Sequence, residues 1–297
     1  MNAAVSAIIV NYNAGELLYA CVNSLLNCPL KIEIIVVDNA SSDGSLEALN
    51  DFAETTIIRN QANIGFSAGC NVGVKHANAD YLLFLNPDCS ITPDAIEQML
   101  SCLQTHQQAG MVGGLLVNSD GTEQAGGRRA VPTPWRSFVR AFGLSKLGNQ
   151  WPRLFFDFYL HKQPLPIQPI EVEAISGACM LVKRDAVNDV GLWDEGYFLH
   201  CEDLDWCMRF RQKGWTIMFV PTARIIHALG MCGRNRRIFV EWHKHKGMIR
   251  FYRKFFRHRY PGALMALVVV GVWLRFSLVA AYHLGKGIGS AVGLRHD

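Results

Sequence analysis

The sequence predicts an α/β fold with a mostly parallel central sheet and helices on both of its faces. Three observations support this. Short apolar runs that suit buried strands alternate with helical patterns about every dozen residues through the first third of the chain. The run Tyr81–Leu85 is bounded by polar residues and is too short for a helix, so we expect a strand buried on both faces. Polar loops follow three of the expected strands, at the sheet edge where open α/β folds bind ligands.

The first half of the chain supplies strands and helices in turn. We expect strands at residues 5–10, 32–37, 56–59 and 81–85. Helices are expected on the periodic apolar positions from Leu17 to Leu25, ending near Pro29, and at 46–52, 66–77 and about 93–105. Thr92 is a good N-cap for the last of these helices, and Pro93 suits its first helical position.

The second half is less regular. Residues 126–169 contain glycines, prolines and many aromatic side chains, which predicts a long flexible loop of the kind that is either functional or mobile. Order returns at residues 171–182, and a helix is expected from about residue 202. A strand at 217–220 is expected to end at Pro221, after which residues 223–226 lead to His227.

Cysteine usage indicates the compartment. The nine cysteines are scattered and form no C-x-x-C pair, which suits a reducing cytosol rather than a disulfide framework. The spacing of His200, Cys201, Cys207, His227 and Cys232 matches no usual pair of zinc ligands. The N-terminus has no basic region before its first expected strand, so we expect no secretory signal.

The loops after the first, second and fourth expected strands are polar: Asn11-Tyr12-Asn13, Asp38-Asn39 and Asn86-Pro87-Asp88. Because the carboxyl ends of parallel strands share one sheet edge, these loops should converge on one crevice. Pro87 has no N–H to give to a sheet, so the strand must end where the Asp88 carboxylate appears. Such a carboxylate can hold a divalent cation that carries phosphate. No G-x-G-x-x-G follows the first strand, so the pattern favours a nucleotide diphosphate site over a dinucleotide site.

A cluster of acids stands at the expected helix start near residue 202. Glu202, Asp203 and Asp205 would be stabilised there by the helix dipole alone. Three acids after a glycine-containing loop also make a plausible general base, and both interpretations are open at this point. His227 is open in the same way, between a structural histidine and a ligand.

Together these residues resemble the inverting family 2 glycosyltransferases, most closely their rhamnosyltransferase-like branch. The resemblance runs from Val5 to His227, about three quarters of the chain, and it is specific because several short motifs occur in order. The motifs are Asn11-Tyr12-Asn13, residues 37–45 (VDNASSDGS), residues 63–73 (NIGFSAGCNVG), residues 85–88 (LNPD), Ser176-Gly177-Ala178, and residues 202–206 (EDLDW) with Arg209.

The resemblance implies a GT-A fold, a nucleotide-sugar donor and a divalent cation, Mg²⁺ or Mn²⁺. Asp38 would read the base, Asp88 would hold the metal, and His227 would be a further metal or diphosphate contact. The family's usual D-x-D is here Asn86-Pro87-Asp88, so the first carboxylate is missing. Asp203 would be the catalytic base, with Glu202 supporting the acceptor site. The other expected donor-binding residues are Asn11, Asn13, Asn63, Gly65, Asn71, Asn86 and Arg209, and the expected acceptor residues are Gly177, Trp193 and Asp194.

The same resemblance implies a catalytic domain at 1–233, with a nucleotide-sugar half at 1–125 and an acceptor half at 126–233. The expected reaction needs charge neutralised on the leaving diphosphate and a base on the opposite face of the sugar, and back-side attack then inverts the anomeric centre. The shape of the donor pocket determines which sugar is transferred. We expect L-rhamnose from dTDP-rhamnose, with a UDP-hexose as the alternative.

Two other classes of protein compete with this interpretation. A sugar nucleotidyltransferase would carry a glycine-rich loop with Arg and Lys after the first strand, where this chain has Asn11-Tyr12-Asn13. A non-catalytic sugar- or membrane-binding protein would have no need for Asp203. Turnover of a nucleotide sugar by the wild type and by Asp203→Asn would separate the three.

The C-terminal region 234–297 has a different character. Residues 224–260 hold eleven Lys or Arg and one acid, which implies a polyanionic partner. A mostly apolar helix face is expected from Ile238, Trp242, His245, Ile249, Tyr252 and Phe256, with Lys246, Arg250, Arg253, Lys254 and Arg257 largely on the other side. This pattern is typical of a helix lying on an anionic membrane, whereas a helix that binds nucleic acid has no need for so many large aromatics.

Residues 264–282 follow as an apolar stretch interrupted only by Arg275, and a span takes about 20 residues. Crossing the bilayer and lying flat are both open, and so is packing on the catalytic domain or in a dimer seam. We expect a membrane-associated enzyme on the cytoplasmic face of the inner membrane. It would act on a lipid-linked glycan acceptor in cell-surface polysaccharide synthesis.

Overall fold

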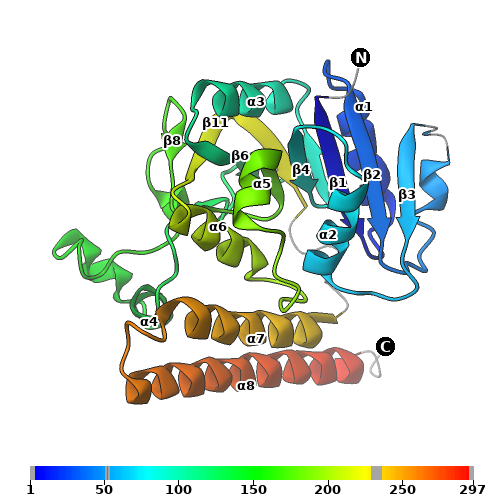
Figure 1. Cartoon of the computed structure of the whole chain (residues 1–297). Helices are drawn as coiled ribbons and strands as arrows, with labels where there is room; N and C mark the ends of the chain where they lie inside the picture. Colours follow the sequence, from blue (N-terminus) through cyan, green and yellow to red (C-terminus); the bar gives the residue numbers. More distant parts are fainter. Residues whose placement is uncertain (1–3, 51, 53, 229–235, 294–297) are drawn as a thin grey trace.

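A nine-stranded mixed sheet forms the centre of the protein, whose computed structural model describes residues 4–50, 52, 54–228 and 236–293 (Figure 1). The strand order is β3-β2-β1-β4-β10-β6-β11-β5, with β8 also paired to β11. The strands β1 (Val5–Asn11), β2 (Ile32–Asp38), β3 (Thr55–Arg59) and β4 (Tyr81–Leu85) are parallel, as are β6 (Ala109–Val117) and β11 (Thr216–His227). The strands β10 (Cys179–Lys183), β5 (Cys89–Ile91) and β8 (Ile170–Glu171) pair antiparallel to their neighbours. A separate small sheet joins β7 (Arg128–Arg129) and β9 (Ala174–Ile175).

Both faces of the main sheet are buried. Alternate residues of β1 enter two different hydrophobic clusters, Ile8 and Val10 on one face and Ala7 and Ile9 on the other. The helices α1 (Glu16–Leu26) and α3 (Ala95–Thr105) cover one face, and α2 (Phe66–His76), α5 (Arg184–Val190) and α6 (Glu202–Gln212) cover the other. The predicted α/β architecture with helices on both faces is therefore confirmed (Figure 1).

Glycines let α2 lie close to the sheet. A Cβ at Gly73 would lie 2.4 Å from the Ile8 side chain, and one at Gly69 would lie 2.7 Å from Val10. At the N-cap of α2, Gly65 has a φ of 88°, and a Cβ there would lie 2.7 Å from the carbonyl oxygen of Phe198. The N-terminal end of α2 is therefore fixed by close backbone packing.

Four elements differ from the expectations. The strand β6 was not predicted, because its apolar run is broken by Gly110, Gly113 and Gly114. Pro221 does not end the strand before it; β11 continues past it through a register shift between Val220 and Arg224. The helix expected at 46–52 is only a short 3₁₀ turn, η1 (Glu47–Leu49). The helix α3 begins at Ala95, after Asp94, and the Thr92 hydroxyl donates to the Arg224 carbonyl instead of capping it.

The segment expected to be a flexible loop contains short helices. They are α4 (Pro134–Ala141), η2 (Leu144–Asn149) and η3 (Leu160–Lys162). The Thr133 hydroxyl caps α4 by accepting from the N–H of Arg136 at 3.1 Å.

Two long helices, α7 (Arg237–Phe256) and α8 (Gly262–Gly293), run side by side along one edge of the protein (Figure 1). The apolar face expected on α7 faces the protein over its second half, where Ile249, Tyr252 and Phe256 are buried. The expectation that this face lies in lipid is wrong there, because these side chains belong to a hydrophobic core cluster of the described residues. The boundary expected at 233 and Cys232 lie outside the described residues.

The helix α8 is apolar on two faces. Met265 and Val272 are buried, whereas Leu267, Leu274 and Leu278 on the other side are 60–73% exposed. By length and composition, residues 262–286 are apolar enough to cross a membrane. The outward apolar face finds no partner within the described residues, which sets α8 apart from the core helices.

Candidate active site

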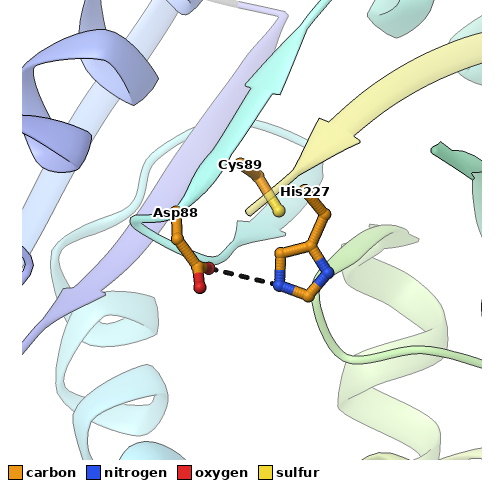
Figure 2. Close-up of side chains that lie close together, drawn as sticks. All are labelled: Asp88, Cys89 and His227. Atoms are coloured by element: carbon orange, nitrogen blue, oxygen red, sulfur yellow. Dashed lines mark ion pairs between the residues drawn. The ribbon is translucent and has the colours of Figure 1, made fainter. Parts of the chain in front are cut away.

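A buried carboxylate and a buried imidazole meet at the end of β4. Asp88 lies in the turn between β4 and β5, and His227 ends β11. Strand pairing places His227 opposite Cys89, so His227 Nε2 comes within 3.3 Å of Asp88 Oδ1 (Figure 2). Both side chains are less than 10% exposed. The two metal residues expected from the resemblance are therefore brought together.

Gln124 holds the other side of the imidazole. Its Oε1 lies 2.6 Å from His227 Nδ1, and its Nε2 donates to Asn118 Oδ1 and to the His227 carbonyl. Because an amide oxygen can only accept, His227 Nδ1 donates its proton to Gln124, and this contact turns Nε2 toward Asp88. Nothing in the sequence marked Gln124, which lies outside every recognised motif.

This donor set fits a divalent cation. Asp88, Cys89 and His227 each offer one ligand atom, all within 4.8 Å of one another. Carboxylate oxygen suits Mg²⁺ and Mn²⁺, and the histidine imidazole is a common metal ligand in proteins. Burial and then the neighbouring Asp88 raise the pKa of the Cys89 thiol well above its usual value, so the thiol stays protonated and donates to the Ala178 carbonyl at 3.5 Å. The fitting ligands are therefore Asp88 and His227.

Asp203 lies in the first turn of α6 and contacts the loop formed by Ser176, Gly177 and Ala178. Its Oδ2 accepts from the Gly177 N–H at 3.1 Å, and a Cβ at Gly177 would lie 3.2 Å from Asp203 Cβ. One residue further along, the Ala178 carbonyl accepts from the Asn86 N–H at 2.9 Å. The Ser176-Gly177-Ala178 loop therefore contacts both the Asp203 carboxylate and the turn that carries Asp88.

Arg129 pairs with the same carboxylate. Its Nη2 donates to Asp203 Oδ2 and to the Ile175 carbonyl, while its buried Nε has no hydrogen-bond partner among the described residues. Burial alone would lower the pKa of Arg129, but Asp203 beside it raises the pKa instead. The sequence offered one signal for this residue, a pair of arginines after two glycines in an irregular segment.

Glu202 differs sharply from its neighbour. It is 7% exposed, and its Oε2 is buried without a hydrogen-bond partner in the described structure. Burial, followed by the charge of Asp203, raises the pKa of Glu202 to about 8. The two adjacent acids therefore differ, because Glu202 is buried without a partner among the described residues whereas Asp203 pairs with Arg129.

The loops after β1 and β2 are tied to each other. Asn11 Nδ2 donates to Asp38 Oδ1 and Ser45 Oγ, each at 2.8 Å, and Asp38 Oδ2 accepts from the Ser41 N–H. Asn13 Oδ1 accepts from the Ser42 N–H at 2.8 Å. The expected donor-binding residues Asn11, Asn13 and Asp38 thus form one polar cluster at the carboxyl ends of β1 and β2.

Asn39, which was matched only as part of a motif, extends this cluster. Its Nδ2 donates to Asn63 Oδ1 and to the Gly65 carbonyl, and its Oδ1 accepts from Asn60. Asn63 Oδ1 also accepts from the Gly65 N–H at 2.9 Å. Asn63 and Gly65 therefore lie beside the β2 loop, at the N-terminus of α2.

Three expected site residues instead hold the segment at 190–196. Asn71 bonds the Trp193 carbonyl, the Trp193 N–H and the Glu195 carboxylate. Arg209 pairs with Asp205 at 2.7 Å and donates to three backbone carbonyls at 190–192. Trp193 is buried and packs on Trp206 with ring centroids 4.2 Å apart. Their contacts therefore hold the segment 190–196 in place rather than point toward the Asp88 turn.

Asp194 faces α7. Burial alone would raise the pKa of its carboxyl, but hydrogen bonds from Lys254, the Gly196 N–H and Arg250 hold it at about 2. Of the three expected acceptor residues, Gly177 therefore touches Asp203, Asp194 pairs with α7, and Trp193 is buried in the core.

Comparison with known proteins identifies the family to which the chain belongs. The profile of glycosyl transferase family 2 matches residues 6–191. The chain is 28% identical to an N-acetylglucosaminyl-diphospho-decaprenol L-rhamnosyltransferase of Mycobacterium tuberculosis, over 76% of each protein. It is 25% identical to the dTDP-rhamnosyl transferase RfbF of Shigella flexneri, covering 85% of this chain and 78% of that protein. It is also 25% identical to the rhamnosyltransferase WbbL of Escherichia coli K12, covering 66% of this chain and 72% of that protein.

Two solved structures share the fold. The mannosyltransferase PcManGT of Pyrobaculum calidifontis, in complex with GDP-Man and Mn²⁺, has a TM-score of 0.57 at 15% identity over 98% of this chain and 81% of that one. GalNAc-T7 with UDP, GalNAc and Mn²⁺ has a TM-score of 0.56 at 17% identity over 76% of this chain and 44% of that one. Because the family profile covers more than half of the sequence, the chain belongs to glycosyltransferase family 2, as a GT-A glycosyltransferase of the rhamnosyltransferase-like branch.

Proposed function

We propose that the protein is an inverting glycosyltransferase that moves L-rhamnose from dTDP-rhamnose to a lipid-linked glycan in cell-surface polysaccharide synthesis. The observation that carries the proposal is the Ser176-Gly177-Ala178 loop, which links the Asp88–His227 pair to the Asp203 carboxylate. The names of the relatives from S. flexneri and M. tuberculosis support the donor and the lipid-linked acceptor.

The roles of the residues follow from their chemistry. Asp88 and His227 would hold a divalent cation, Mg²⁺ or Mn²⁺, which neutralises charge on the departing nucleoside diphosphate when bound. Asp203 would take the proton of the attacking acceptor hydroxyl, and attack opposite the leaving group inverts the sugar. Arg129 and the Gly177 N–H orient Asp203 by binding one of its oxygens. Asn11, Asn13, Asp38, Asn63 and Gly65 would bind the nucleotide.

A panel of nucleotide sugars tests the donor. Each is added with Mn²⁺, and thermal stabilisation and release of the nucleoside diphosphate are measured; saturation at 100 times Kd stabilises by about 2.7 kcal/mol. We expect dTDP-rhamnose to stabilise the protein and to be consumed. A response to a UDP-hexose alone would move the assignment to that donor, and turnover of none would overturn the transferase proposal for this chain.

We further propose that the enzyme lies on the cytoplasmic face of the inner membrane, with α8 flat in the interface. The exposed leucines of α8 support lipid contact. The packing of α7 beside α8 argues against a span, because crossing would carry the lysines and arginines of α7 into the bilayer. Arg275, the one charge in the apolar stretch, turns toward α7 and donates to His245 Nε2 at 3.0 Å.

A further inference from the structure

A cavity of about 530 Å³ opens between α7, α8 and the loop before α6. It is lined by Gly196, Lys246, Ile249, Arg250, Arg253, Lys254 and Trp273. This volume is ordinary for a small-molecule site. No expected site residue lines it, and the glycosyl transfer derived above does not use it.

Four cations line the cavity from one face of α7. Arg250 and Lys254 are held by protein carboxylates, since both pair with Asp194 and Lys254 also reaches Asp205 at 2.7 Å. Lys246 and Arg253 form no hydrogen bond or ion pair with any described residue. The cavity therefore carries two positive charges that the described protein does not neutralise, and it is complementary to a doubly charged anion.

The Arg250 guanidinium lies directly over the loop before α6. A Cβ on Gly196 would lie 2.3 Å from Arg250 Cζ, so the guanidinium would have to move if a larger residue stood there. Arg250 also lies over the Tyr197 ring, with its Cζ 5.3 Å from the centroid. These contacts fix Arg250 at the cavity wall, which gives the site a preformed part.

The other lining side chains are apolar. Ile249 is buried, and Trp273 comes from α8, where its ring packs 4.9 Å from that of Trp242. The apolar part of the lining therefore consists of Ile249 and Trp273, one from each of the two C-terminal helices. A ligand that combines an anionic head with a hydrocarbon tail matches both walls.

The cavity lies next to the acceptor side of the active site. Gly247 follows Lys246, and a Cβ on it would lie 2.7 Å from the carbonyl oxygen of His200. His200 precedes Glu202 and Asp203 by two and three positions. The same α7 turn therefore packs against the start of α6 and borders the cavity.

We propose that this cavity binds the phosphate or diphosphate of the lipid-linked acceptor, with the first part of its hydrocarbon chain on Trp273 and α8. The inference rests on the proposed function for its biological ligand, and it assigns Lys246, Arg250, Arg253 and Lys254 to recognition of that phosphate. The donor diphosphate, held at the Asp88 turn, is a separate ligand.

The test uses the full-length protein in phosphatidylcholine nanodiscs and farnesyl diphosphate as the probe, with EDTA present so that no metal recruits the diphosphate to Asp88. Calorimetry against empty nanodiscs compares wild type, Lys246→Gln/Arg253→Gln and the control Arg237→Gln/Arg257→Gln, which removes the same charge from exposed positions at the two ends of α7. We expect the cavity variant to bind at least about tenfold more weakly, because charge-assisted contacts to phosphate are lost, and the control to bind within about twofold of wild type. Farnesol and inorganic pyrophosphate should each bind more weakly than farnesyl diphosphate.

Three results would overturn the site. Equal losses in both double variants would indicate general surface charge, unchanged binding in the cavity variant would place the lipid elsewhere, and farnesol binding as tightly as farnesyl diphosphate would exclude phosphate recognition. Nucleotide-sugar hydrolysis is measured in parallel. Hydrolysis should persist in the cavity variant. Absence of hydrolysis in the wild type would contradict the proposed function. Intact hydrolysis together with unchanged farnesyl diphosphate binding in the cavity variant would contradict only this inference.

Discussion

Asp203 shares one carboxylate oxygen between a backbone N–H and a buried guanidinium. We expect Asp203→Asn to lower turnover by roughly 10²–10⁴, because the amide cannot take the acceptor proton, while donor affinity stays nearly constant. Turnover at saturating donor and donor binding are measured separately. If the variant keeps most of its activity, Glu202 or Asp205 becomes the candidate base.

Asp88 is the carboxylate of the expected metal pair, and Gln124 orients its histidine partner. Asp88→Ala should abolish metal-dependent donor binding, and His227→Ala should weaken it less. Gln124→Met should weaken Mn²⁺ affinity by roughly 10–100-fold, since it frees the imidazole to rotate, and Gln98→Met on α3 is the matched control. Mn²⁺ affinity is measured by electron paramagnetic resonance. Full activity in excess EDTA would contradict the metal assignment.

Glu202 gives a pH dependence of defined sign. Its pKa is about 8 in the folded protein against an ordinary value of 4.5, so between these values the folded state binds the extra proton. Stability then falls as pH rises from about 5 to about 8. The unfolding free energy of Glu202→Gln, relative to wild type, should therefore increase over that range in urea titrations. Glu97→Gln, an exposed carboxylate on α3, is the control, and a constant difference would contradict the burial argument.

At the scale of elements, α2 depends on two glycines that face β1. Gly73→Ala should destabilise the protein by about 1–3 kcal/mol, because the added methyl overlaps Ile8 in a packed interface. Gly271→Ala on α8 is the matched control, since nothing described lies within 4 Å of its Cβ position. Urea unfolding measures the free energy of unfolding of both variants. Equal changes in the two would show that helix propensity alone, and not packing against Ile8, determines the effect.

The elements also show what a sequence can and cannot predict. The strands β1, β2 and β4 were predictable because each is a short apolar run that ends in a polar loop. The strand β6 was not, because glycines interrupt its run; a Cβ at Gly114 would lie 2.3 Å from Ile225, so close packing rather than propensity places it there. In the site, motif residues such as Asp88 and Asp203 were predictable, whereas Arg129 and Gln124 act only through neighbours distant in sequence.

The molecule as a whole carries an apolar surface on α8 beside a basic α7. Leu267→Glu/Leu274→Glu should lower partition into vesicles by about a hundredfold, since each exposed leucine would contribute at least about 1.5 kcal/mol in lipid. Tyr19→Glu/Leu26→Glu, which adds the same charge to exposed positions of α1, should leave the partition unchanged. Vesicle sedimentation without detergent measures both. Equal partition of the two variants would favour a dimer seam in place of lipid.

The bulge at Pro221 determines which face of the sheet the residues after it point to, because it contains an odd number of residues. Pro221, Thr222 and Ala223 of β11 have no partner on β6, and an odd number of unmatched residues decides which face the following side chains take. Beyond the bulge, Ile225 and His227 are buried, while Arg224 and Ile226 are exposed. Deleting one residue there would leave the sequence after it intact and yet turn His227 away from Asp88. Whether this chain can bring His227 to Asp88 thus depends on how many residues the bulge contains, independently of which residues they are.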